Sequence, residues 1–152
     1  MKSLLQRRSA LAWLAVVAAG TAGLAHAGAY DDFLRAIARG DAATVASLLR
    51  RGFDPNARDP KGQPALILAL REEARQVAEV LIAAKGLKVE ERNAKDESAL
   101  MMAALRGNLP AARGLIAREA DVTKTGWAPL HYAAASPTAD AAAMVALLLE
   151  HH

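Results

Sequence analysis

Apolar residues along this chain recur in short clusters with helical spacing, and the clusters themselves recur. The leading cluster of each copy is anchored at Phe33, Leu66, Leu100 or Leu130, so successive anchors lie 33, 34 and 30 residues apart. Within a cluster the apolar side chains fall at i, i+3 and i+4, which predicts a helix with one buried face. Repetition at a period of this length predicts a stack of small helical units that are unstable alone.

A second apolar cluster follows each first one, and the stretches are residues 45–49, 78–82, 112–116 and 145–149. Gly40 and Gly107 fall between the two clusters of their units, where positive φ permits a tight turn, and Glu73 takes that place in the second unit. We therefore expect an all-α solenoid of about four helix pairs with short hairpin loops.

The sequences of the four copies resemble the ankyrin repeat. The segments that lead into and include the first helices are GQPALILAL at 62–70, DESALMMAA at 96–104 and GWAPLHYAA at 126–134. The loops that follow the second helices read GFDPN, GLKVE and EADVT. The family pattern is G-x-T-P-L-H-x-A-A, then V-x-x-L-L-x-x-G-A-D-V-N, and the match covers about residues 30–152. The resemblance implies an ankyrin-repeat domain over 28–152, with units at about 30–59, 60–93, 94–123 and 124–152, the last uncapped.

Several positions depart from the family pattern. Only His131 keeps the histidine of T-P-L-H, and only Ser98 can replace the threonine that caps the first helix. Loss of an N-cap costs about 1 kcal/mol, so we expect soft repeats. The loop at 119–126 is three residues shorter than its counterparts, and residues 136–138 make the last inter-helix turn longer.

The N-terminal residues 1–27 are predicted to be a secretory signal peptide. Lys2, Arg7 and Arg8 precede an apolar run from Ala10 to Ala19, and a small-x-small cleavage motif ends at Ala27. An uncleaved transmembrane anchor is the alternative, but a span needs about 18 apolar residues or more. The paired arginines admit twin-arginine export, although the flanking residues favour the general route.

Export changes the charge argument. The chain has 19 basic and 16 acidic residues, and removing residues 1–27 takes away three basic residues and no acidic one. The mature chain is then neutral, so its charge gives no indication of nucleic-acid binding. The chain has no cysteine. An exported protein without disulfides or thiol chemistry that is built of ankyrin units indicates a periplasmic location.

The search for catalytic chemistry is negative. The mature chain has three histidines, His131, His151 and His152, and no metal-ligand, phosphate-loop or nucleophile-elbow motif. We interpret His131 as structural and read no metal site into the terminal pair, which also resembles the start of a vector-derived tag. We expect no enzyme activity, no cofactor and no metal.

The remaining hypothesis is a binding surface. In ankyrin proteins partners usually meet the hairpin tips and the first helix of each unit, a concave face. The resemblance assigns to that face Arg58, Lys61, Gln63, Arg71, Arg92, Lys95, Glu97, Arg106, Lys124 and Trp127. Its excess of basic residues predicts a partner with an acidic surface, whereas solvated loop tips are the simpler interpretation. Trp127 fits a binding hot spot, but packing on the next hairpin is favoured.

We therefore expect a non-catalytic protein–protein interaction module of the cell envelope, binding neither nucleic acid nor, once cleaved, the membrane. One alternative is an immunity- or inhibitor-type protein for a secreted toxin or enzyme. Another is an envelope scaffold tethered to the membrane by an uncleaved N-terminal helix. The apolar residues of 144–149 leave the last unit without a polar outer face, which favours a fragment of a longer array or an end covered by another protein.

Overall fold

The computed structural model describes residues 26–152, and within that range the chain is helical with no strand. The first helix covers residues 26–39. The others are α2 (Ala42–Arg50), α3 (Ala65–Arg71), α4 (Arg75–Ala83), α5 (Ala99–Leu105), α6 (Leu109–Ile116), α7 (Pro129–Ala134) and α8 (Ala141–Glu150).

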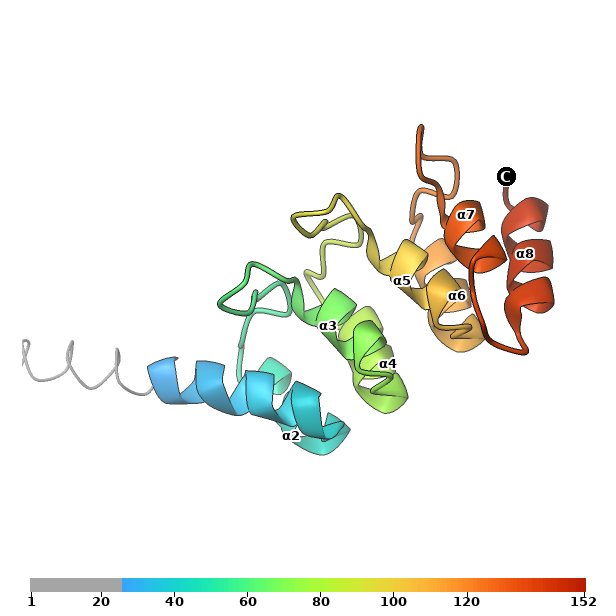
Figure 1. Ribbon diagram of the computed structural model, residues 1–152. Coiled ribbons are helices and arrows are strands. Elements are labelled where there is room, and N and C mark those ends of the chain that lie inside the picture. The colour runs from blue at the N-terminus through green and yellow to red at the C-terminus, as the bar shows by residue number, and fades with distance from the viewer. Residues whose placement is uncertain (1–25) are drawn as a thin grey trace, which may run out of the picture.

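The helices form four consecutive pairs that stack along one axis (Figure 1). The first helices of successive pairs pack on one another, α3 on α5 and α5 on α7, and the second helices form another row, in which α2 contacts α4 and α4 contacts α6. The loops before α3, α5 and α7 project from the same edge of the stack (Figure 1). The all-α solenoid of helix pairs predicted from the sequence is confirmed.

The core is one continuous layer between the two rows of helices. Phe33, Leu66 and Leu100 are fully or almost fully buried, whereas Leu130 of the last pair is only partly buried. Small residues let neighbouring helices approach closely. A Cβ added at Gly114 of α6 would lie 3.2 Å from a methyl carbon of Ile82 on α4. The alanine-rich composition therefore sets how tightly the units stack.

Helix caps differ between the two rows. Ser98 caps α5 as expected, because its Oγ accepts a hydrogen bond from the Met101 amide at 3.3 Å. Asp41 and Asn108 cap the second helices α2 and α6, which the sequence analysis did not anticipate. The hydrogen bonds from Thr44 lower the pKa of Asp41. The first helices α3 and α7 have no side-chain cap hydrogen bond at Pro64 and Ala128.

Three acidic residues occupy the left-handed region of backbone conformation. Glu73, Asp96 and Glu119 have φ of 56°, 60° and 64°, at repeat positions where other units carry glycine. Such a conformation costs a residue with a Cβ roughly 1 to 2 kcal/mol. Glu73 pairs with Arg106 of the next unit at 3.2 Å, and Asp96 pairs with Lys124 of the next unit. Glu119 belongs to no ion pair within the described residues.

Two predicted features lie at the ends of the described chain. The signal peptide lies outside residues 26–152 except for its last two residues, His26 and Ala27, which are exposed. Between residues 26 and 152 no helix combines the length and apolar character needed to cross a bilayer. At the other end, α8 exposes 56% of Leu149. Whether the last unit lacks a cap in the whole protein stays a prediction.

The unpaired left-handed glutamate gives a direct test of the repeat alignment. We expect Glu119→Gly to raise the free energy of unfolding by about 1 kcal/mol, because glycine removes the Cβ strain. The measurement is urea unfolding followed by circular dichroism. Glu73→Gly is the matched control and should gain less, because it also loses the Arg106 ion pair. A destabilised Glu119→Gly variant would contradict this account.

Candidate functional site

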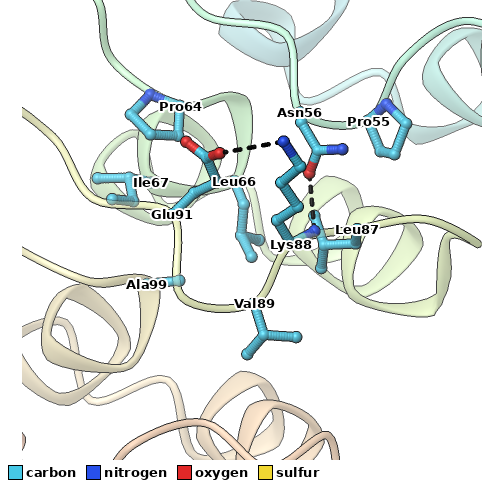
Figure 2. A pocket seen from close by; sticks show the side chains of 10 residues that line it. All are labelled: Pro55, Asn56, Pro64, Leu66, Ile67, Leu87, Lys88, Val89, Glu91 and Ala99. Atoms are coloured by element: carbon cyan, nitrogen blue, oxygen red, sulfur yellow. Dashed lines mark hydrogen bonds and ion pairs between the residues drawn. The ribbon is translucent and has the colours of Figure 1, made fainter.

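Hydrogen bonds between successive loops fix the edge from which the hairpins project. The Asn56 side chain donates to the Gly86 carbonyl at 2.9 Å and accepts from the Lys88 amide at 2.8 Å. Figure 2 shows Asn56 beside Lys88, with the Lys88 ammonium directed toward Glu91. One repeat later Glu90 occupies the position of Asn56 and accepts from the Asp121 amide at 2.8 Å. The same repeat position therefore joins each loop to the next.

A second repeated position shapes the first two hairpin tips. Asp59 Oδ1 accepts from the amides of Lys61 and Gln63 at 2.9 and 2.8 Å. Asn93 Oδ1 accepts from the amides of Lys95 and Glu97 at 2.9 and 3.0 Å. Each tip is a tight turn closed by a side chain, and it holds its lysine out in solvent.

The shortened third loop has neither of these side-chain contacts among the described residues. Its side chain to backbone bond is from the Thr123 amide to Asp121 Oδ1, at 2.9 Å and before the tip. Glycine at Gly126 takes the positive φ of 89° at the turn. This tip differs from the other two both in shape and in the residue that it presents, Trp127.

Two of the predicted site arginines form ion pairs within the protein. Arg58 donates to the carbonyls of Gly62 at 2.8 Å and Arg92 at 3.0 Å, and it pairs with Glu91 of the next unit. Arg92 pairs with Glu90 at 2.8 Å and with Asp96 at 3.7 Å. Their charges are compensated within the protein. The Arg58 contacts to Arg92 and Glu91 join neighbouring loops, whereas the Arg92 ion pairs lie within its own loop.

Arg106 and Lys124 are also paired. Arg106 lies 3.2 Å from Glu73 of the preceding unit, and Lys124 contacts the Asp96 carboxylate. The hydrogen bond from Lys124 lowers the pKa of Asp96. The predicted binding face therefore has a smaller excess of basic over acidic side chains than the sequence indicated. The acidic residues that pair with these basic residues were not among those assigned to the face.

The other predicted residues differ in exposure. Lys61 and Lys95 are exposed at the first two tips and form no ion pair within residues 26–152, and Arg71 at the end of α3 is half-buried. Gln63 is 8% exposed, and its Nε2 is buried without a hydrogen-bond partner in the described structure. The structure places Gln63 under the tip and not on its surface.

Glu97 and Trp127 lie around a tyrosine that the sequence analysis did not assign. Tyr132 of α7 donates to Glu97 Oε1 at 3.3 Å, and its ring centroid lies 6.4 Å from that of Trp127. Trp127 also contacts the ring of His131 at 5.4 Å and remains 69% exposed. His131 Nδ1 accepts from the Ala128 amide at 3.1 Å, so this histidine bonds within its own unit.

The described residues contain no group of three or more histidine, cysteine, aspartate or glutamate side chains placed to hold a metal ion. A small pocket under the first two hairpins, drawn in Figure 2, has a volume of about 10 Å³. That is room for about one water molecule, and its lining is mostly apolar, including Leu66, Ile67 and Leu87.

Comparison with known proteins identifies the repeat. A family model described as ankyrin repeats (3 copies) matches residues 33–125 and 74–152. No curated protein matches this sequence. Ankyrin repeats are generally protein–protein interaction modules, and proteins built from them are typically binding modules and not enzymes. The matched residues cover most of the chain, which belongs to the ankyrin-repeat family.

Proposed function

We propose that this protein is a non-catalytic interaction module that binds a partner protein across its hairpin tips and first helices. The observation that carries the proposal is Trp127, which is 69% exposed although almost every other large apolar side chain in the described residues is buried or half-buried. Tryptophan is enriched at binding hot spots, where its burial supplies a large share of the affinity.

The partner-facing set is narrower than the one read from the sequence. Three members are exposed and form no ion pair in the described residues, and these are Lys61, Lys95 and Trp127. Each belongs to one of three successive hairpin loops, which project from the same edge of the stack (Figure 1). Two uncompensated lysines favour a partner with an acidic patch, because they steer its approach. Arg58, Arg106 and Lys124 support this surface through contacts to the neighbouring unit, and Arg92 supports it through ion pairs within its own loop.

We further propose that the protein acts in the periplasm after cleavage following Ala27. The support is the sequence of residues 1–27, and Ala27 and Gly28 are exposed in the folded domain. Two alternatives remain within this proposal. If the partner is a secreted toxin or enzyme, the protein acts as its inhibitor. If residues 1–27 are not cleaved and tether the protein to the membrane, it acts as an envelope scaffold. Loss of the partner's activity on binding identifies the first, and membrane retention at precursor mass identifies the second.

Capture of the partner from the native organism tests the binding surface. The bait is the full-length chain with a C-terminal affinity tag, crosslinked in living cells and analysed by mass spectrometry. We expect one or more proteins to be enriched with the unchanged bait. The triple variant Lys61→Ala, Lys95→Ala, Trp127→Ala should lose them, because removing a hot-spot tryptophan alone costs about 2 kcal/mol, roughly 30-fold in affinity.

The matched control carries the same number of substitutions on the second helices α2, α4 and α6, which form the outer row of the stack. Arg50→Ala, Arg75→Ala and Arg113→Ala remove exposed side chains from α2, α4 and α6. This control should retain the partner as the unchanged bait does. Equal recovery of the partner by the triple variant at the hairpin tips (the tip variant) would contradict the assigned binding surface. If none of the baits enriches a specific protein, the proposal of an interaction module is contradicted.

Processing is tested on the same tagged protein. Export with cleavage predicts that intact mass spectrometry of the periplasmic fraction finds a chain beginning at Gly28. Ala25→Arg and Ala27→Arg should block processing, since signal peptidase needs small residues at these two positions. Recovery of the unchanged protein at precursor mass in the membrane fraction would instead support the tethered scaffold.

A further inference from the structure

We propose that the end of the surface formed by Trp127, Tyr132 and Glu97 receives an arginine side chain of the partner protein. This inference rests on the proposed function and adds to it the chemistry of one contact. It differs from the acidic patch expected opposite the lysines, because here an aromatic side chain and a carboxylate lie together.

The aromatic side of this contact is open. The Trp127 ring meets His131 and Tyr132 at interplanar angles of 65° and 83°, both edge-to-face arrangements. These contacts orient the indole, yet 69% of the residue remains exposed. An indole face is the best aromatic acceptor of a cation, and a guanidinium also stacks on it through its planar group.

Glu97 supplies a carboxylate without a countercharge. It takes part in no ion pair within the described residues, whereas the three other acids of its own loop, Glu90, Glu91 and Asp96, all do. Its bonds come from neutral donors, Asn93 Nδ2 at 2.6 Å to Oε2 and Tyr132 at 3.3 Å to Oε1. A carboxylate offers about four acceptor sites, so both oxygens can still accept.

The neighbouring charges do not neutralise Glu97. Lys124 and Arg92 both face Asp96, and Lys124 is bound to its carboxylate. Lys95 stands exposed at the tip of its own turn with no contact to Glu97 among the described hydrogen bonds. Burial and the adjacent carboxylate raise the pKa of Tyr132, which keeps its hydroxyl protonated as a donor to Glu97.

Among the described units the arrangement occurs once, because other units carry different residues at the repeat positions that form it. Gln63, Glu97 and Trp127 each lie three residues before the anchor leucine of their unit, and Met102 holds the position of Tyr132 in the preceding pair. Gln63 is neutral and buried, and Met102 is 4% exposed. The pair of units joined by the shortened loop thus has a cation-binding chemistry that the preceding pair lacks.

Arginine fits this surface better than lysine. Its planar group can stack on Trp127 while donating two parallel hydrogen bonds to the Glu97 carboxylate, and a lysine ammonium acts as a point charge that cannot do both. An acidic side chain is disfavoured here, since it would face Glu97 directly.

The test is titration of the full chain by NMR with N-acetyl-arginine methylamide, followed through the Trp127 indole and the amides of residues 93–97, 126–128 and 130–132. We expect saturable shifts with millimolar affinity for this single side chain. The citrulline analogue, which is neutral and of the same shape, should bind at least about tenfold more weakly, and the lysine analogue should fall between them.

Two variants separate this contact from general folding effects. Glu97→Gln removes the charge at almost unchanged shape, because its amide oxygen can accept from Asn93 and its NH2 group can donate to the Tyr132 hydroxyl oxygen. It should weaken arginine binding about tenfold. Glu79→Gln makes the same change at an exposed position of α4 and should have no effect. Unchanged amide shifts elsewhere show that each variant is folded. Equal binding of arginine and citrulline, or by Glu97→Gln and the unchanged chain, would overturn the inference.

The outcome is distinguishable from failure of the proposed function. If the tip variant loses a captured partner while arginine does not bind, the interaction module stands and the arginine contact is wrong. If arginine binds as expected, Glu97→Gln should also reduce recovery of the captured partner. Loss of arginine binding with full recovery of that partner places the partner's contacts at the lysines.

Discussion

Burial between neighbouring units is the constraint on which the rest of this structure depends. The helices after the first are short, from six residues in α7 to ten in α8, and helices of this length do not persist alone in water. Each unit can bury its apolar stripe only against the next one, so stability accumulates along the array as interface terms. The placement of every loop follows from this stacking.

Stacking also determines how the charged residues are used. The loops meet along one edge, where their polar backbone groups need partners, and Asn56, Glu90 and Arg58 supply hydrogen bonds from one unit to the next. Glu73 and Asp96 have a strained, left-handed backbone conformation, and their side chains form ion pairs across the same boundary between units. What remains for a partner are the groups that face away from the neighbouring loop.

The periodic features of the sequence predicted the fold well. The spacing of Phe33, Leu66 and Leu100 predicted the helix pairs, and Gly40 and Gly107 take the positive φ that was expected between the two helices of their units. The candidate site was less predictable, because a list of tip residues contains no information on pairing. Arg58 and Glu91, like Glu73 and Arg106, lie one repeat apart in the sequence, and only stacking brings them together. A comparison of oppositely charged residues that lie one repeat apart in the sequence could have identified these ion pairs.

Hydrogen exchange of the full chain, alone and bound to its captured partner, tests the central claim most directly. The account predicts slower exchange on binding at residues 59–63, 93–97 and 124–132, where the hairpin tips and α7 meet solvent. The outer helices α2, α4 and α6 should exchange as they do in the free protein. Protection concentrated on those outer helices, with the tips unchanged, would contradict the account.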